Sequence, residues 1–105
     1  MNSRMKWSKT RALGQHHLAD KRILRKILDS ARIGRNEVVC EAGTGEGTLT
    51  QELCKHAKKV ISYEIDSVLY LRALNYLSGF PNLYLVHSDI FKISNIEFHV
   101  FVSNL

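Results

Sequence analysis

The sequence has few of the residues that mark membrane, secreted and metal-binding proteins. It has two cysteines in 105 residues, Cys40 and Cys54, too few for a disulfide framework or a cysteine-rich zinc site. No apolar run approaches the roughly 18 residues of a membrane span, and no apolar segment of a secretory signal follows the basic N-terminus. We therefore expect one cytoplasmic domain that is stabilised by a hydrophobic core and holds no metal.

Acidic residues are scarce in the first third of the chain. Residues 1–35 hold ten Lys or Arg and two acids, a balance of +8, whereas residues 36–105 hold five and eight, a balance of −3. Residues 1–13 form a basic arm with a single Trp, which is suited to neutralising RNA phosphates and stacking on a base. Its basic residues are Arg4, Lys6, Lys9 and Arg11. A solvated tail explains the same charge equally well, so the role of this arm stays open.

Apolar residues alternate between strand-like and helix-like patterns from residue 20 onward. A first helix is expected between an Asp20 cap and Gly34. The patterns then predict strands over residues 38–42, 60–65, 83–87 and 99–103, and helices over residues 48–57 and 67–77. Strands that alternate with helices form right-handed βαβ units, so we predict an α/β fold with a parallel sheet over residues 14–105.

Three glycines at alternate positions follow the first strand. They are Gly43, Gly45 and Gly47. A glycine turn lets a ligand approach the backbone where a Cβ atom would collide with it. The next helix begins near Thr48 and points its free N–H groups into the same space. Strand, glycine turn and helix together predict a site for a nucleotide-type cofactor.

Acidic residues stand at the ends of three predicted strands, where open α/β sheets bind their ligands. They are Glu41, Glu64 and Asp89. Glu64 follows Gly43 by 21 residues, close to the spacing at which an acid accepts hydrogen bonds from ribose hydroxyls. Asp89 is suited to accept from an exocyclic amine, with Ile65 and Ile90 flanking an adenine ring. One such acid is commonly a helix cap, but three beside a glycine turn predict a bound nucleoside.

The glycine spacing distinguishes between nucleotide classes. A dinucleotide fingerprint places its third glycine three residues after the second, where this chain has Thr48. Glu41, just before the turn, would also repel a pyrophosphate, and it better suits a ligand with an ammonium group, such as the methionine part of S-adenosylmethionine. A P-loop is excluded because no Gly-Lys-Ser/Thr ending follows the turn.

Five ordered segments carry a family resemblance. They are Gly-Gln-His-His-Leu at 14–18, Glu-Ala-Gly-Thr-Gly-Glu-Gly at 41–47, Tyr-Glu-Ile-Asp at 63–66, Ser-Asp-Ile at 88–90 and Ser-Asn-Leu at 103–105. In this order they resemble motifs of the ribosomal RNA adenine N6-dimethyltransferases, relatives of the macrolide-resistance rRNA methylases. The resemblance covers residues 11–105. It implies part of a Rossmann-like class I methyltransferase sheet, parallel in the order 3-2-1-4, with helices on both faces.

The resemblance also implies a cofactor, a substrate and a role for each matching residue. The cofactor is S-adenosylmethionine and the substrate is adenine N6 in small-subunit ribosomal RNA. Residues 16 and 18 would lie at the methionine end of the cofactor, residue 64 at the ribose and residue 89 at the adenine amine. The implied cofactor-binding residues are His16, Leu18, Glu41, Gly43, Gly45, Glu64, Ile65, Asp89 and Ile90.

Asn104 is the implied catalytic residue. It would orient the amine of a target adenine flipped out of its RNA stack, so that the nitrogen lone pair attacks the methyl group in line. Two departures from the family pattern stand out: His17 replaces the usual Phe, and the sequence stops inside the family's Asn-Leu-Pro-Tyr motif. We therefore expect the 105-residue chain itself to be weakly active or inactive.

Two other functions and an assembly follow from the same residues. The basic N-terminal half favours, as the main alternative, a non-catalytic RNA-binding or ribosome-assembly module. A nicotinamide oxidoreductase is disfavoured by the glycine spacing. In the order 3-2-1-4, residues 100–102 would form an exposed apolar edge strand, and such edges pair with other chains. This arrangement predicts a homodimer through residues 100–102.

Overall fold

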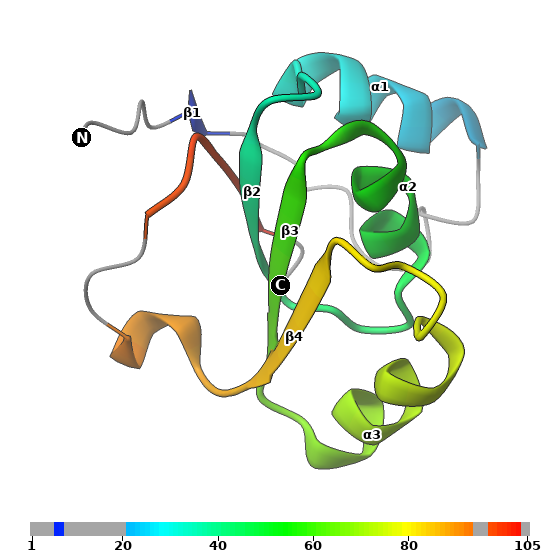
Figure 1. Cartoon of the computed structure of the whole chain (residues 1–105), viewed down its shortest axis with the longest axis vertical. Helices are drawn as coiled ribbons and strands as arrows, with labels where there is room; N and C mark the ends of the chain where they lie inside the picture. The colour runs from blue at the N-terminus through cyan, green and yellow to red at the C-terminus, as the bar shows by residue number, and fades with distance from the viewer. Residues whose placement is uncertain (1–5, 8–20, 94–96, 104–105) are drawn as a thin grey trace.

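The computed structural model describes residues 6–7, 21–93 and 97–103, which form one parallel sheet with helices packed against it (Figure 1). The strands are β1 (Lys6–Trp7), β2 (Val38–Ala42), β3 (Lys59–Glu64), β4 (Leu83–His87) and β5 (Val100–Ser103). The helices are α1 (Lys21–Ala31), α2 (Thr48–His56), α3 (Ser67–Tyr76) and the 3-10 helix η3 (Ile90–Lys92).

The strand order is β1-β5-β2-β3-β4, with β2 at the centre. Val39 of β2 pairs with Val60 of β3 on one side and with Val100 of β5 on the other. For the four strands expected from the sequence, this is the predicted order 3-2-1-4, and the prediction is confirmed. Because all pairs are parallel, the carboxyl ends of β2, β3 and β4 lie at the same edge of the sheet.

The predicted exposed edge at residues 100–102 is wrong. Lys6 and Trp7 of β1 pair in parallel with Val100 and Phe101, so β5 has a strand on each side. Val100 and Val102 have exposures of 0%. The edge on which the homodimer prediction was based is therefore covered by β1, so the structure does not support a homodimer through residues 100–102. Two residues of the segment predicted as a basic arm also belong to the sheet.

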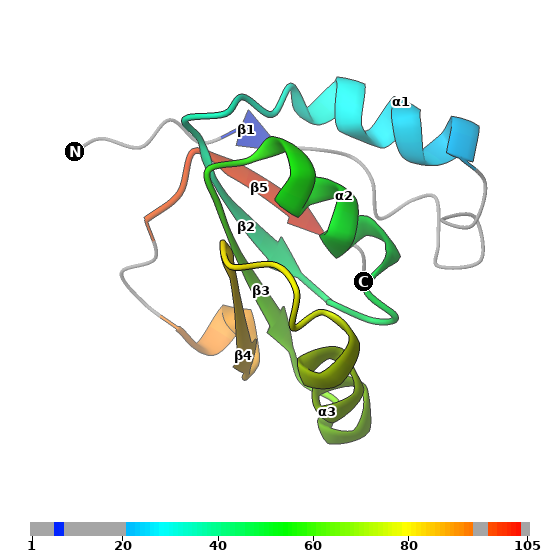
Figure 2. The ribbon, with the colours of Figure 1, turned by 45° about the vertical axis from the view of Figure 1, so that its right-hand side comes forward.

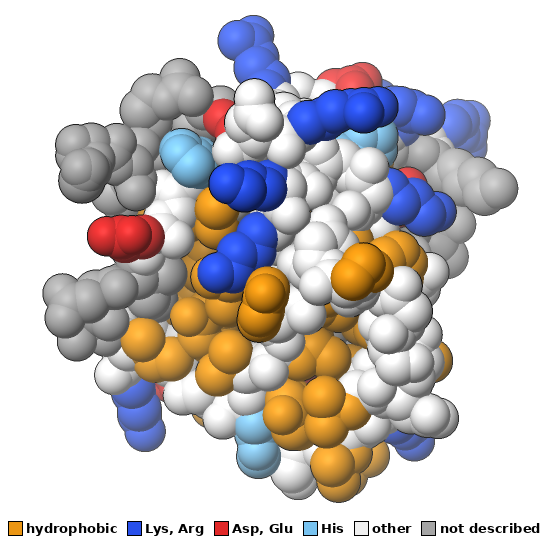
Figure 3. All heavy atoms as spheres, viewed as in Figure 1, with side chains coloured by type: hydrophobic (Ala, Val, Ile, Leu, Met, Phe, Trp, Pro, Cys, Tyr) orange, Lys and Arg blue, Asp and Glu red, His pale blue; other side chains and the backbone are white. Residues whose placement is uncertain are grey.

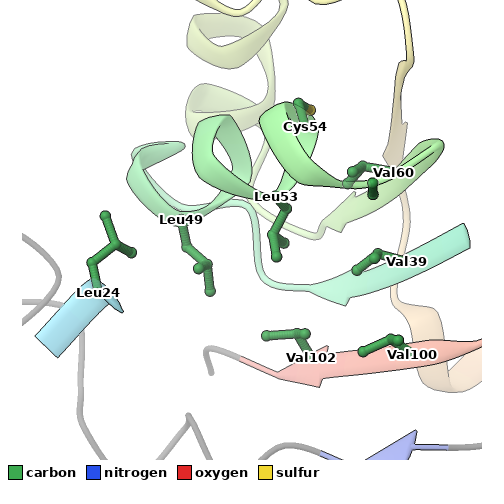
Figure 4. Close-up of a cluster of buried hydrophobic side chains, with 9 residues drawn as sticks. Leu24, Val39, Leu49, Leu53, Cys54, Val60, Val100 and Val102 are labelled. Carbon is green, nitrogen blue, oxygen red and sulfur yellow. The ribbon is translucent and has the colours of Figure 1, made fainter. Parts of the chain in front are cut away.

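One face of the sheet carries the three α-helices and the larger hydrophobic cluster (Figures 2 and 4). Leu49 and Leu53 of α2 pack between valines of β2, β3 and β5 and Leu24 of α1 (Figure 4). The other face is covered by a smaller cluster in which Ile90 of η3 packs with Phe101. Helices thus lie on both faces, as expected, although in the described part of the chain the second face carries a 3-10 helix alone. Among the described residues, no helix has the length and apolar content to cross a membrane.

Helix α1 ends earlier than the sequence predicted. It stops at Ala31, and Arg32 adopts a left-handed conformation with φ of 51°. Gly34, the expected end, lies in the following turn, where its N–H donates to the Glu37 carboxylate at 2.9 Å. The expected Asp20 cap lies outside the described residues. Arg32 thus takes the left-handed position at the end of the helix where glycine was expected, and its N–H donates to the Leu28 carbonyl at 3.1 Å.

Side chains fix the ends of the other two α-helices. Asn82, just before β4, donates from Nδ2 to the carbonyls of Cys54 at 2.9 Å and Ala57 at 3.1 Å, where α2 runs out of intrahelical partners. Asp66 caps α3 by accepting from the N–H groups of Val68 and Leu69. The Asn82 contacts hold the end of α2 at the amino edge of the sheet, and the Asp66 cap fixes the start of α3 at the carboxyl edge, which contains the predicted site.

Candidate functional site

The loop between β2 and α2 depends on glycine at three positions. Gly43, Gly45 and Gly47 have φ angles of 95°, 57° and 84°, a region that side-chain-bearing residues rarely adopt. The Gly43 N–H donates to the Tyr63 carbonyl at 2.8 Å, which anchors the loop to β3. The Gly47 N–H donates to the Thr44 carbonyl at 2.9 Å and closes the turn before α2. The predicted glycine turn is therefore present, with Gly43 half-buried at the carboxyl edge of the sheet and Gly45 and Gly47 buried.

A cavity of about 250 Å³ opens at the carboxyl ends of β2, β3 and β4. It is lined by Ala42, Gly43, Tyr63, Glu64, Ile65, Ser88, Asp89, Ile90 and Phe91. Five of these nine were predicted as cofactor-binding residues from the sequence. The lining is mainly apolar, with two carboxylates, which is the composition expected of a small-molecule site.

Glu64 is the most constrained acid of the cavity. Its exposure is 5%, and its two oxygens accept backbone hydrogen bonds, Oε1 from Gly45 at 2.8 Å and Oε2 from Asp66 at 2.9 Å. These bonds join the glycine loop to the start of α3 through one side chain. A carboxylate oxygen has two lone pairs, so each oxygen can still accept from a ligand hydroxyl.

Asp89 occupies the same relation to η3 that Asp66 has to α3. Its Oδ1 accepts from the Phe91 N–H at 3.0 Å, which caps the 3-10 helix. The remaining acceptor capacity of the carboxylate is available to a donor in the cavity. Ile65, at 65% exposure, and Ile90, at 7%, provide apolar surface beside it.

Glu41 lies beneath the loop and does not line the cavity. It has an exposure of 0%, and its Oε1 accepts from the Thr50 hydroxyl at 2.6 Å and the Ser62 hydroxyl at 2.7 Å. Its Oε2 is buried with no hydrogen-bond partner among the described residues. Burial, aided by the charge of Glu64, raises the pKa of Glu41 to about 7, although the two hydroxyl donors lower it. A contact between Glu41 and a ligand ammonium stays a prediction.

The structure brings five predicted residues to the cavity and leaves others untested. Gly45 is buried behind the cavity, where its N–H holds Glu64. Of Lys6 the structure describes the backbone in β1, not the side chain. The predicted residues outside the described part of the chain are His16, Leu18, Asn104, Arg4, Lys9 and Arg11.

Sequence reasoning missed four lining residues. Ala42 and Tyr63 are register partners and so face the same side of the sheet, a relation that strand alternation alone makes available. Ser88 adjoins a predicted acid. Phe91 follows Asp89 by two residues in a segment predicted to be irregular, and nothing in the local pattern assigns its orientation.

Comparisons with known proteins agree on one family. The family model described as ribosomal RNA adenine dimethylase matches residues 7–103. The chain is similar to ribosomal RNA small subunit methyltransferase A of Caldanaerobacter subterraneus subsp. tengcongensis, at 36% identity over 92% of this chain and 34% of that protein. It is 43% identical to the Thermotoga maritima protein of the same description, over 89% of this chain and 34% of that one.

Solved structures give the same result. A dimethyladenosine transferase from Plasmodium falciparum superimposes with a TM-score of 0.74 and 34% identity, covering 82% of this chain and 32% of that one. The 23S rRNA methyltransferase ErmE gives 0.69 and 38%, covering 73% and 32%. The chain therefore spans about a third of the length of the curated relatives it matches, 34% and 29% in two of them.

Proposed function

Because the chain belongs to the ribosomal RNA adenine dimethylase family, we propose that it binds S-adenosylmethionine and serves methyl transfer to adenine N6 in small-subunit ribosomal RNA. The observation that carries this proposal is the convergence of Gly43, Glu64 and Asp89 on the same cavity. We propose ribosomal RNA as partner, contacted by the basic arm of residues 1–13, and the cytoplasm as location.

The residues present fit the adenosine part of the cofactor. At about 250 Å³ the cavity is smaller than the roughly 300–1,000 Å³ of sites that enclose a drug-sized ligand, so it suits a nucleoside rather than the whole molecule. Glu64 would accept from the ribose hydroxyls and Asp89 from the exocyclic amine, with Ile65 and Ile90 against the ring. The methionine part would lie along the backbone at Gly43, where no Cβ blocks its approach.

The chemistry divides between the cofactor and the chain. When bound, S-adenosylmethionine supplies an electrophilic methyl group on its sulfonium. Glu64 and Asp89 orient the nucleoside. Glu64 is held by a backbone donor of the glycine loop and Asp89 by one of its own turn, so both carboxylates are positioned before the ligand arrives. We propose that Asn104 orients the target amine, because it matches the first residue of the family's Asn-Leu-Pro-Tyr motif.

The test is calorimetric titration of the chain with S-adenosylmethionine. We expect one site, and at least roughly tenfold weaker binding by Glu64→Ala because two ribose hydrogen bonds to a carboxylate are lost. Since Glu64 also anchors Gly45 and Asp66, Glu64→Gln tests the charge with most of the packing kept. Glu46→Ala, at an exposed position of the same loop, is the control and should bind like the parent.

One outcome would favour the alternative. In that outcome, labelled RNA binds the parent chain and binds the Glu64→Ala variant equally well, while the folded protein gives no binding heat with S-adenosylmethionine. The chain would then be a non-catalytic RNA-binding module. Cofactor binding that Glu64→Ala leaves unchanged would contradict the site instead.

A further inference from the structure

Phe91 is a large apolar side chain at the mouth of the cavity. It lines the cavity from η3 and is 72% exposed. Seven large hydrophobic side chains of the described residues are exposed: Ile65, Val68, Leu71, Leu74, Tyr76, Tyr84 and Phe91. Many hydrophobic side chains gather on the face of the molecule shown in Figure 3. Of the seven, Ile65 and Phe91 line the cavity, so their apolar surface faces the space where a ligand would bind.

The backbone around Phe91 is held by the same acid that we assign to the adenine amine. Asp89 Oδ1 accepts from the Phe91 N–H at 3.0 Å, and the Lys92 N–H donates to the Asp89 carbonyl at 3.0 Å. Ile90, between them, is buried against the sheet at 7% exposure. With Ile90 pointing inward and Asp89 capping the turn, η3 presents an acceptor and an aromatic ring to one cavity.

We propose that the Phe91 ring stacks on the adenine ring of the cofactor, so that η3 recognises the base by its amine and by its face. This inference rests on the proposed function and adds a residue to its site. Adenine fits because a purine offers a flat aromatic face to the ring and a donor to Asp89. A hydrocarbon ligand would use the apolar surface but has no donor for the carboxylate. Burying an exposed aromatic side chain against a second ring is favourable through both area and stacking.

The experiment measures binding of S-adenosylhomocysteine to the parent chain and to four variants by calorimetry. We expect Phe91→Ala to bind roughly tenfold more weakly or worse, since base stacking on an aromatic contributes on this scale. Phe91→Tyr keeps the ring and should stay within about threefold, whereas Phe91→Leu should fall between the two. Leu71→Ala is the matched control, because Leu71 is 62% exposed on α3 and does not line the cavity.

A positional measurement accompanies the affinities. The chain has four phenylalanines, so selective labelling gives few ring signals, and the signals lost in Phe91→Ala identify that ring. Nuclear Overhauser effects from the Phe91 ring to the adenine H2 or H8 protons of S-adenosylhomocysteine are expected in the parent complex. Merely structural support of η3 would not produce them.

The outcomes separate the two proposals. Two results would overturn the role of Phe91 and leave the proposed function standing. The first is a dissociation constant of Phe91→Ala within about twofold of that of a binding parent chain. The second is a parent complex without Overhauser effects between the Phe91 ring and adenine. No binding by the folded parent would overturn the proposed function, and this inference with it. If Phe91→Ala melts well below the parent, Phe91→Leu and the Overhauser measurement on the parent decide the matter.

Discussion

Glu41 holds an ionisable group inside the layer between β2 and α2. The Ser62 hydroxyl has one proton and donates it to Glu41, so the 2.5 Å contact between Thr44 Oγ1 and Ser62 Oγ requires Thr44 to donate. A series of hydrogen bonds thus runs from the glycine loop through Ser62 to Glu41. Glu41 also accepts a hydrogen bond from the Thr50 hydroxyl of α2. One carboxyl group therefore connects the glycine loop, β3 and α2 by hydrogen bonds. Its protonation state is expected to affect the stability of all three.

This carboxyl group makes stability depend on pH. Its pKa is raised from 4.5 to about 7 in the folded chain, mainly by burial, so the folded state holds a proton that the unfolded state releases. Its contribution to stability is therefore full below pH 4.5 and is lost as pH rises through about 7, a change of about 3 kcal/mol. Glu41→Gln should remove this component, so its free energy of unfolding relative to the parent rises between pH 5 and pH 8 in urea titrations.

Glu46→Gln is the control for this pH dependence. Glu46 is an exposed carboxylate of the same loop, and its replacement should leave the slope of stability against pH like that of the parent. A Glu41→Gln profile parallel to the parent profile would show that Glu41 is ionised in the fold across this range. Because the comparison is between variants, other groups that titrate in the same window cancel.

Residues of the site were predictable where position on a strand determines position in space. Glu64 and Asp89 come at or just after strand ends, and the carboxyl ends of parallel strands meet at one edge, so both line the cavity as expected. Glu41 also ends a predicted strand, but its side chain points to the α2 face with Ser62, its register partner. Strand alternation puts Glu64 on the same face as Ser62, but Glu64 is the last residue of β3, whereas Glu41 lies one residue before the end of β2 and is covered by α2.

Gly47 links the glycine loop to two helices, and a side chain at this position would be strained. It precedes α2 with φ of 84°, and a Cβ there would lie 3.0 Å from Leu77 Cδ1 and 3.1 Å from Tyr76 Cε1. The end of α3 therefore packs directly on the turn that begins α2. The third glycine of the motif serves helix packing, even though its spacing differs from that of the dinucleotide fingerprint.

Gly47→Ala should destabilise the chain by about 2 kcal/mol or more. The left-handed conformation costs a residue with a Cβ roughly 1–2 kcal/mol, and the contacts with Leu77 and Tyr76 add to it. Gly79→Ala is the matched control, because nothing lies within 4 Å of its Cβ, and it should change stability by less than about 0.5 kcal/mol. Chemical denaturation measures both, and equal effects of the two substitutions would contradict the packing role of Gly47.

Elements were predicted best where composition and turn residues agree. The strand at 83–87 and the start of α2 at Thr48 match the sequence prediction, because an apolar run and a glycine turn define them. The end of α1 was predicted at Gly34 and lies at Ala31, since Arg32 takes the left-handed conformation that glycine favours. The 3-10 helix η3 was expected to be irregular, because three residues carry no periodicity.

At the scale of the whole molecule, the sheet order was predictable and its edge was not. The order of β2 to β5 is the one that the family resemblance implies, and the motifs that carry this resemblance are local segments of the sequence. Strand β1 has two residues, and its first pair, Lys6 with Val100, joins positions at opposite ends of the chain. No local pattern indicates such a pairing. One short strand therefore converts the predicted exposed edge into an interior position, and the edge strands of the described sheet are the two-residue β1 and β4.

This asymmetry predicts an order of hydrogen exchange. Strand β2 is paired on both sides, and Val39 and Cys40 have exposures of 0%, so its amides should exchange only in the largest unfolding events. Strand β4 is paired with β3 alone, and its residues are half-buried or exposed. We expect amides of β2 to exchange at least roughly 100-fold more slowly than those on the free side of β4, corresponding to about 3 kcal/mol or more.

Amide-resolved exchange by NMR makes the comparison within one sample, and β4 amides that point toward β3 serve as internal controls of intermediate rate. Saturating S-adenosylhomocysteine should slow the β2 amides further, because a ligand that binds only the folded state stabilises it by mass action. Uniform protection of β4 on both sides would mean that its free edge is covered in solution. That result would place a partner on β4, the edge strand opposite β1 in the described sheet.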